Sequence, residues 1–463
     1  MFSQIKKMFL KENSIRSASL ILMITFAASN VLGVIRDHFL AQKIPTDRLD
    51  IYYAAFRWPD LIFNVLILGS VAAAFVPVYS KCMKEEGEEK ANELATTTIS
   101  VAVVIVAAAL VMLFFLMPYL MHVLVPSFSP EKMAETIQAA RWLLISPLIF
   151  TVSYFLGGVL NARKRFVSYA LAPIVYNLSI ILSILFLSDR YGVRGVIIGV
   201  ITGAFLHMLT QLPASLRVGL KIGFKPNFFD KNVIRIIRLM VPRAIGLGAN
   251  QILLFAYTGF ASAFPGAIAI YNLTDNIQTV PSAIFGNSFA TAVFPTLAEL
   301  SIKEKEERER FCNVFVKAIK AALFFLIPAT AVIFVLRAQI IRLILGYGFF
   351  GWADTKSASA ALGFFALSVV AQGLIPIFAR GFYAMHDTKT PMTISLFSIL
   401  ASIVFGYIFS RGGFLTSGPV AGLALAFSIG SWINLILLFY YIQESVHLRV
   451  RELSWHTAIV SVL

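Results

Sequence analysis

The feature that most constrains this chain is a series of long apolar runs that recurs along almost its whole length. The hydrocarbon core of a bilayer needs roughly 20 apolar residues per helix, and twelve runs come close to that length. They are residues 18–40, 61–80, 94–117, 142–160, 168–188, 192–212, 239–264, 268–297, 318–336, 358–383, 390–410 and 417–441. Backbone polar groups in lipid have to pair within the chain, so these runs predict an all-α polytopic membrane protein.

The composition excludes a soluble globular protein. Hydrophobic residues make up 58% of the chain and charged residues only 14%, whereas soluble domains carry about 25% charged residues. A thirteenth apolar run begins at Trp455 and stops at Leu463, so we expect a chain that is truncated within an additional helix. The basic start is followed by a long run without a small-residue cleavage pattern, which argues against a cleaved signal peptide.

The formal net charge of +15 has a membrane explanation. An excess of basic residues is typical of nucleic-acid-binding proteins, but multispanning proteins also place Lys and Arg preferentially in their cytoplasmic loops. With the N-terminus inside, most of the 39 lysine and arginine residues fall on the inner side. We therefore predict a cytoplasmic N-terminus and no nucleic-acid partner.

Signals of enzyme chemistry are missing from the sequence. The two cysteines and six histidines are scattered and match no metal-ligand spacing. There is no phosphate-binding glycine-rich loop and no nucleophile elbow. We predict a transporter with no cofactor and no metal, whose transport is passive or is driven by a coupling ion or the membrane potential.

Two halves of the chain resemble each other. Residues 51–79 and 270–299 both open with Ile-Tyr and close on a Phe/Val-Pro pair, and residues 157–173 and 379–395 both join two helices by a short basic loop. We predict two six-helix lobes, 1–225 and 226–443, related by an axis along the membrane normal, with 444–463 starting an additional C-terminal helix. The basic segment 217–238 is predicted as an amphipathic cytoplasmic linker or a solvated loop. Such repeats enclose a midplane site and work by alternating access.

Polar side chains in or beside the apolar runs are the candidate functional residues, because a charge in hydrocarbon costs several kcal/mol unless it faces a cavity or a partner. They concentrate in the first two runs of each half, so these four helices are predicted to line one central cavity. The candidates are Asn30, Arg36, Asp37, Arg57, Asp60 and Asn64, and in the second half Arg243, Asn250, Gln251, Asp275, Asn276, Gln278 and Asn287. Two structural alternatives stay open: the charged residues anchor helix ends, or the amides hydrogen bond between helices.

Several ordered motifs resemble the MurJ (MviN) family. They are RGFYAMHDTKTPM at 380–392, NVLGVIRDHFLA in the first helix, AAAFVPVYSK at the end of the second, GVLNARKRFVSYALAPIVYN, and NLTDNIQTVPSAIFG. The resemblance implies the multidrug/oligosaccharidyl-lipid/polysaccharide exporter fold, with two lobes around a central cavity. It also implies that the substrate is lipid II, the undecaprenyl-diphosphate-linked peptidoglycan precursor, flipped from the inner to the outer leaflet of the bacterial cytoplasmic membrane.

The resemblance also implies a cationic substrate site. Arg36 and Asp37 match the Arg-Asp of the family's first helix, Asp50 matches the acidic residue before the second, and Arg57 takes a position that is usually basic. The predicted substrate-binding set is Arg36, Asp37, Asp50, Arg57, Asn30, Asn64, Arg243, Asp275 and Asn276. Three positions that are usually arginine are Asn30, Phe63 and Asn276 here, which should weaken diphosphate binding by about 1–3 kcal/mol for each charged hydrogen bond lost.

Other functions remain open at this point. One is a flippase for a different polyprenyl-diphosphate-linked glycan, another is a MATE-like ion-coupled exporter of small cations, and a third is a membrane scaffold that does not transport. Arg36, Arg57 and Arg243 argue against an exporter of organic cations, which would want an acidic cavity. The expected partners are the lipid-linked diphosphate and membrane lipids. Proteins of cell-wall synthesis are a further expected class of partner.

Overall fold

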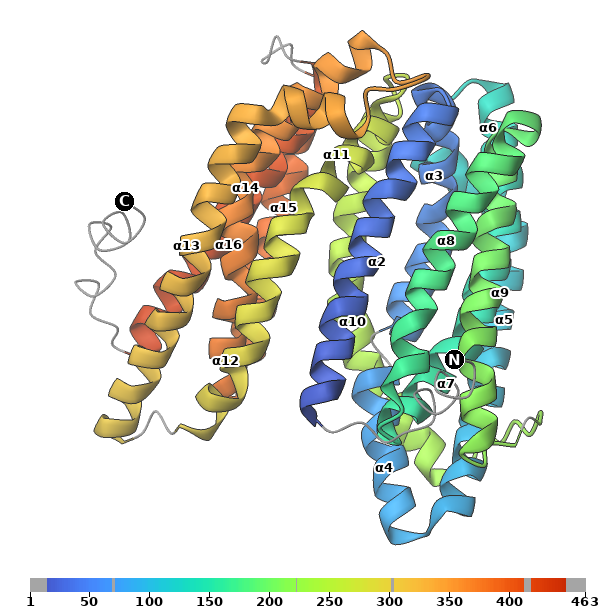
Figure 1. Cartoon of the computed structure of the whole chain (residues 1–463), viewed down its shortest axis with the longest axis vertical. Coiled ribbons are helices and arrows are strands. Elements are labelled where there is room, and N and C mark those ends of the chain that lie inside the picture. Colours follow the sequence, from blue (N-terminus) through green and yellow to red (C-terminus); the bar gives the residue numbers. More distant parts are fainter. Residues whose placement is uncertain (1–14, 69–70, 222, 301–303, 412–417, 447–463) are drawn as a thin grey trace. The chain divides into compact units, whose positions relative to one another are not determined.

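The computed structural model describes residues 15–68, 71–221, 223–300, 304–411 and 418–446 (Figure 1). Within these ranges, side chains are described except at 15–23, 68, 72–73, 241–247, 249, 305 and 445–446. The described residues form helices and the turns that join them, without a β-strand. The predicted all-α class is confirmed.

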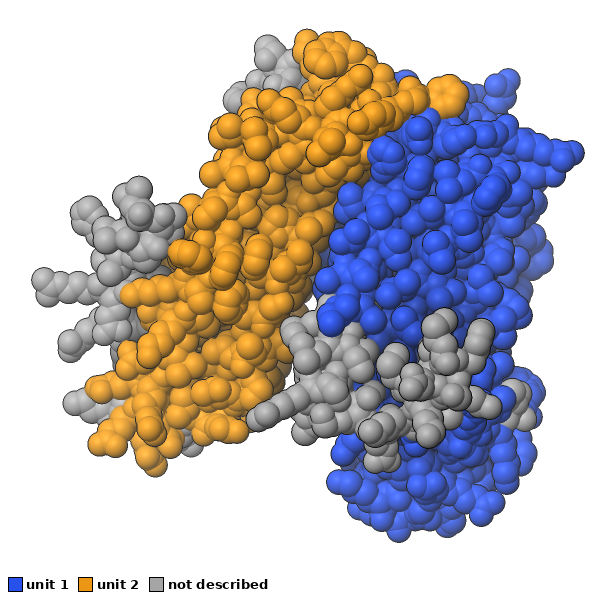
Figure 2. All heavy atoms as spheres, in the orientation of Figure 1, with its two compact units in different colours: residues 1–265 blue, residues 266–463 orange. Residues whose placement is uncertain are grey.

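The chain divides into two compact units, Met1–Pro265 (unit 1) and Gly266–Leu463 (unit 2), which Figure 2 colours separately. The lobe boundary expected at 225/226 and the symmetry axis stay predictions. Most of the expected additional helix at 444–463 lies outside the described residues.

Unit 1 is a bundle of long helices with two π-helical segments. Its α-helices are α2 (Ile15–Lys43), α3 (Thr46–Ile62), α4 (Val76–Glu85), α5 (Glu88–Leu124), α6 (Pro130–Leu143), α7 (Ile145–Ala162), α8 (Phe166–Tyr191), α9 (Val193–Arg217) and α10 (Lys231–Ala261), and its π-helices are η1 (Phe63–Leu68) and η2 (Val71–Phe75). Helix α8 packs along both α2 and α9, and α7 packs on the other side of α9. Helix α10 contacts α3, η1, η2 and α5, so its partners lie in unit 1.

Unit 2 is organised around one central helix. It contains α11 (Ala267–Pro281), the π-helix η3 (Ser282–Gly286), α12 (Asn287–Glu299), α13 (Lys305–Ile344), α14 (Trp352–Ala384), α15 (Lys389–Arg411) and α16 (Pro419–Val446). Helix α14 packs against α11, α12, α13 and α16, and α15 packs on the far side of α16.

The twelve predicted apolar runs fall on these helices. The helix that leads into the second run, α3, starts well before the run itself, which is predicted at 61–80. The helical residues on either side of 69–70 begin at Thr46, directly after Pro45, and end at Glu85, and they include the two π-helices. Among the described residues, eight helices are long and apolar enough to cross a membrane. The protein is a multi-pass membrane protein.

Two local backbone features occur at corresponding places of the sequence repeat. A π-helix begins at Phe63 and again at Ser282, and the two starts are 219 residues apart, as are the repeat's opening residues Ile51 and Ile270. The non-glycine residues with positive φ in the described chain are Lys164 (55°) and His386 (61°). Each follows a helix end that is closed by a hydrogen bond back over five residues, Arg165 N to Leu160 O (2.8 Å) and Asp387 N to Phe382 O (3.0 Å). The short basic loops of the two halves are therefore the same type of turn.

Small residues bring α8 and α9 together. Ser179 Oγ donates to the carbonyl of Gly199 at 3.2 Å, and Ser183 Oγ donates to that of Gly195. A Cβ added at Gly203 would lie 2.9 Å from the Tyr176 ring, closer than real Cβ atoms come. These glycines allow the backbones to approach closely, as small residues do at interfaces between membrane helices.

The basic linker between α9 and α10 is held against α5. Asn92 Nδ2 donates to Val218 O (3.2 Å), Thr96 Oγ1 to Lys221 O (2.9 Å), and Ser100 Oγ accepts from Lys225 N (3.0 Å). The three side chains are spaced four residues apart on one face of α5. Lys221 and residues 223–229 are exposed, so the solvated-loop alternative describes this part of the linker, and the hydrogen bonds to α5 hold it in place up to Lys225. Helix α10 then starts behind Asp230, whose carboxylate accepts from two backbone amides.

Candidate functional site

The best-defined candidate site in unit 1 is built on Arg36, in the C-terminal half of α2. Its guanidinium donates through Nε (3.1 Å) and Nη2 (2.9 Å) to the same carboxylate oxygen of Asp37. Its Nη1 reaches Asn177 Oδ1 on α8 at 3.3 Å. The Arg36 side chain is 22% exposed and that of Asp37 only 2%, so the carboxylate lies behind the guanidinium and part of the guanidinium stays accessible.

Asn177 is the residue that joins α2 to α8 at this site. Its amide nitrogen lies within hydrogen-bond distance of Ser29 Oγ (3.2 Å) and of Pro173 O on its own helix (3.2 Å), while its oxygen accepts from Arg36. Sequence reasoning missed Asn177, although its polar side chain within the apolar run 168–188 is a signal of the kind used for Asn30 and Asn64.

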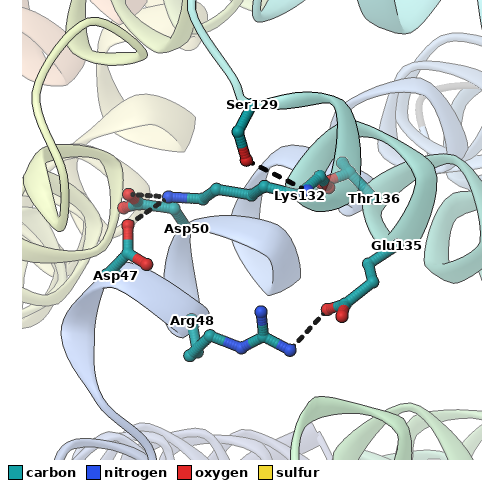
Figure 3. A network of polar contacts seen from close by, with 7 residues as sticks. All are labelled: Asp47, Arg48, Asp50, Ser129, Lys132, Glu135 and Thr136. Atoms are coloured by element: carbon teal, nitrogen blue, oxygen red, sulfur yellow. Dashed lines mark hydrogen bonds and ion pairs between the residues drawn. The ribbon is translucent and has the colours of Figure 1, made fainter.

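Asp50 lies in an ion-pair network between the first turns of α3 and α6 (Figure 3). Lys132 Nζ contacts Asp50 at 3.0 Å and Asp47 at 2.5 Å, and Arg48 pairs with Glu135. The Asp50 side chain is 1% exposed and that of Lys132 is 12% exposed. This arrangement attaches α6 to α3, with α6 itself starting at Pro130 behind the Ser129 cap.

Arg57 and Asp60 occupy consecutive turns of α3 but have different surroundings. Arg57 is buried, and its Nε donates to Thr258 Oγ1 on α10 at 2.8 Å. Asp60 lines a cavity within unit 1 together with Phe63 and His207. The hydrogen bond to Thr258 shows that Arg57 joins α3 to α10 in this conformation.

Two predicted asparagines of unit 1, Asn30 and Asn64, hydrogen bond to carbonyls four residues earlier in the chain. Asn30 Nδ2 donates to Phe26 O, and Asn64 Nδ2 to Asp60 O, each at 2.8 Å. The Arg243 side chain lies outside the described residues. Phe63, at a position that the resemblance implies to be arginine, packs against Phe150 (ring centroids 5.2 Å apart) and Tyr154 (5.1 Å).

The two remaining candidates lie in unit 2, on α11. The Asp275 carboxylate accepts from Gln278 Nε2 at 2.8 Å, and Gln278 in turn accepts from Ser368 on α14 at 3.4 Å. Asn276 is half-buried on the same helix. The structure thus brings together Arg36 with Asp37, and it pairs Asp50 with Lys132, while a common cavity lined by α2, α3, α10 and α11 stays a prediction.

The chemistry available at the Arg36 cluster is anion binding. A guanidinium presents a planar set of donors that matches the oxygens of a phosphate, and the carboxylate behind it fixes its orientation. Among the described residues no group of three or more His, Cys, Asp or Glu side chains could hold a metal ion.

Comparisons with known proteins point to one family. A profile described as lipid II flippase MurJ matches residues 46–463. A probable lipid II flippase MurJ of Rhizobium tropici is 28% identical over 440 residues, covering 91% of this chain and 79% of that protein. The probable lipid II flippase MurJ of Rickettsia prowazekii (strain Madrid E) is 28% identical over 446 residues, covering 94% and 85%.

Solved structures share the fold. A lipid II flippase MurJ in an inward closed conformation superposes with a TM-score of 0.78 at 23% identity, covering 92% of this chain and 87% of the other. An inward-facing multidrug resistance MATE transporter of the MOP superfamily gives a TM-score of 0.73 at 15% identity, covering 92% and 98%. The exporter fold expected from the motifs is therefore confirmed.

Proposed function

Because this chain belongs to the MurJ family, we propose that it flips lipid II from the inner to the outer leaflet of the membrane. The observation that carries the proposal is the family match over residues 46–463, which includes all of unit 2 and most of unit 1. The protein is a transporter and not an enzyme: it moves its substrate by alternating access and changes no covalent bond.

In this proposal Arg36 binds the diphosphate of the lipid. Its guanidinium is partly exposed and already oriented by Asp37 and Asn177, so binding does not have to order a long flexible side chain. Asp37 is buried and cannot contact the substrate directly while it holds the guanidinium, so we assign it a positioning role. Asp50, paired with Lys132, likewise positions α6 against α3.

We place the protein in the bacterial cytoplasmic membrane with its N-terminus inside. The distribution of basic residues supports this orientation. In this orientation the linker between α9 and α10 and the loop before α13 lie in the cytoplasm. Cys312, half-buried on α13, then faces the cytoplasmic side, whereas Cys82 is buried and a poor probe. Labelling of Cys312 in intact cells by a membrane-impermeant thiol reagent would contradict this orientation.

A second candidate substrate is a different polyprenyl-diphosphate-linked glycan. The observation that favours it is Phe63, whose ring lies in an aromatic cluster where the resemblance implies a cation. Loss of a charged contact costs about 1–3 kcal/mol, enough to change substrate preference by one to two orders of magnitude. Both candidates use the same diphosphate chemistry at Arg36.

The test is complementation of cells depleted of their own lipid II flippase. The full chain should restore growth and should make lipid II accessible to a probe added outside the cells. Expression without either effect, with the protein present in the membrane at normal amounts, would rule out lipid II. Flipping of another polyprenyl-diphosphate glycan by purified protein in vesicles would then support the second candidate.

A further inference from the structure

A small polar cavity lies within unit 1, among α3, η1, α7, α8 and α9. Its volume is about 140 Å³, and its lining includes Asp60, His207, Tyr154, Tyr176 and Phe63. Pockets for drug-sized molecules measure about 300–1,000 Å³, so this cavity is too small for a lipid diphosphate and has room for a few water molecules. An acid and a nitrogen base thus share one small cavity inside a membrane-embedded unit.

His207 is held from behind by two polar side chains. Its Nδ1 lies 2.7 Å from Ser153 Oγ on α7, and Gln211 Nε2, one turn further along α9, lies 2.9 Å from the same Oγ and 3.3 Å from Nδ1. Gly157 provides the space for Gln211, since a Cβ there would lie 2.6 Å from Gln211 Oε1. The imidazole is therefore fixed in position without a charged partner behind it.

The hydrogen bonds among His207, Ser153 and Gln211 can be arranged to suit either protonation state of His207. The Gln211 amide nitrogen only donates, so Ser153 directs its hydrogen to Nδ1, which then accepts as part of a neutral imidazole. Gln211 Oε1 is buried and has no hydrogen-bond partner among the described residues, an arrangement that costs about 1–3 kcal/mol. Rotation of the amide by half a turn places this oxygen beside Ser153. A protonated Nδ1 then donates to Ser153, and Ser153 donates to Gln211.

Asp60 is the acidic residue in the lining of the same cavity. No described residue donates a hydrogen bond or forms an ion pair to its carboxylate, and Arg57 acts on it only electrostatically from the same helix. With Asp60 ionised and His207 neutral, the residues that line the cavity carry one negative charge, which the Arg57 charge on the same helix partly offsets. Binding of one proton to either group removes this net charge from the lining.

We propose that the Asp60–His207 cavity binds the proton that couples transport to a proton gradient, an inference that rests on the proposed flippase function. Hard metal cations prefer several oxygen ligands, whereas an imidazole beside a carboxyl is suited to take up and release a proton. The His207 ring also stacks on Tyr154, with centroids 5.7 Å apart and planes 15° from parallel. An aromatic face attracts an imidazolium more than a neutral ring.

Other charged and titratable groups around the cavity do not replace this pair. Helix α3 adds Arg57 and Tyr52, and α2 adds Arg36, which interacts electrostatically with Tyr176 on α8. Helix α7 adds the hydroxyls of Ser146 and Tyr154, α8 adds Tyr169, and α9 adds the Gln211 amide. Both arginines have partners of their own, Thr258 and Asp37, and stay charged throughout.

The cavity is in direct contact with a π-helix, which gives proton binding a structural consequence. Asp60 lies one turn before η1, and Phe63, the first residue of η1, packs edge-on against Tyr154, which stacks on His207. π-helical turns are rare and occur often at functional sites. A change of charge at His207 is thus passed through Tyr154 to the point where the α3 path changes its winding.

The first test reads protonation without using transport. Infrared difference spectra between mildly alkaline and mildly acidic buffer are recorded for the purified full chain in lipid nanodiscs. We expect bands of an imidazole and a carboxyl that change with pH, with the imidazole band lost in His207→Gln and the carboxyl band lost in Asp60→Asn. Both bands should persist in two controls outside the cavity, His122→Gln and the exposed Asp189→Asn, which pairs with Lys43. Asp60→Asn removes no hydrogen bond, so it remains usable if His207→Gln fails to fold.

The second test measures flipping of lipid II in proteoliposomes. An acidic outer side should stimulate wild-type flipping several-fold and leave both cavity variants unstimulated, while the two controls respond like the wild type. Infrared bands that survive in both cavity variants would overturn the proposal, because the two groups would then keep a fixed protonation state. Stimulation by sodium at constant pH would overturn it in favour of a metal cation. Absence of any flipping would instead refute the proposed function, while the infrared result would still decide the proton site.

Discussion

Removing Lys132 should destabilise the protein more than any other single change among the ion pairs that join α3 and α6. The Lys132 ammonium lies 3.0 Å from Asp50 and 4.4 Å above the Phe128 ring, and the Asp50 side chain is 1% exposed. Deletion of one partner of a buried ion pair costs about 3–5 kcal/mol, because the other charge stays buried without compensation. Asp50 also has another polar interaction, so we expect Lys132→Ala to cost about 3 kcal/mol, at the lower end of that range.

The matched control is Arg48→Ala, in the first turn of α3 and in the same network between α3 and α6 (Figure 3). Arg48 pairs with Glu135, but both side chains are more than a third exposed, and exposed pairs contribute about 0–1 kcal/mol. A double variant, Lys132→Met with Asp50→Asn, removes both charges and should recover most of the lost stability, because no buried charge is left alone. The comparison therefore separates the cost of an unpaired carboxylate from the loss of side-chain packing.

The assay is equilibrium unfolding of the purified protein in mixed micelles, followed by tryptophan fluorescence with increasing denaturing detergent. Refolding from the unfolded side has to retrace the curve before free energies are compared. A Lys132→Ala loss no greater than that of Arg48→Ala would refute the reasoning. So would a double variant that is less stable than Lys132→Ala alone.

Three further predictions concern the substrate site and the turns. Arg36→Lys should weaken flipping of lipid II in complemented, flippase-depleted cells. Arg36→Ala with Asp37→Asn should lower it by about 10- to 100-fold, the equivalent of one or two charged hydrogen bonds. Lys43→Ala, at a half-buried basic residue on the same helix, should leave flipping unchanged, and normal flipping by the Arg36 double variant would exclude Arg36 from the site. Asp387→Ala should cost about 1 kcal/mol in unfolding experiments and Asp387→Asn less, because Asp387 accepts from the amides of Lys389 and Thr390 at the start of α15. Although partial burial acts to raise it, the pKa of Asp387 lies below its ordinary value because of the hydrogen bonds from Thr390 and Lys389. This stabilisation is present above the ordinary aspartate pKa and is lost as the pH falls through the lower folded-state pKa, so the difference between wild type and Asp387→Ala should shrink in acid; a constant difference would contradict the assignment. Lys164→Gly and His386→Gly should each stabilise the protein by about 0.5–1 kcal/mol, because both positions have positive φ, and unchanged or lower stability would show that their side chains compensate for the strain.

Much of the molecule could be predicted from the sequence because membrane helices are determined by local properties. The length and spacing of the apolar runs predict helices, since the bilayer leaves the backbone no other way to pair its polar groups. The glycines of α9 predict close packing, and the motif around Asp387 is a helix end followed by a helix cap, both of which depend on a few consecutive residues. The Arg36–Asp37 ion pair also lies between neighbours in the chain.

The partners of the candidate residues were decided only by the tertiary structure. Asn177 is 141 residues from Arg36, Lys132 is 82 residues from Asp50, and Thr258 is 201 residues from Arg57. A single sequence carries no signal for which distant polar side chain will face which, because this depends on the rotation and depth of each helix after packing. The same is true of His207, which looks like an isolated histidine in the sequence. Only the packing of α7, α8 and α9 places it between Ser153, Gln211 and the cavity that contains Asp60.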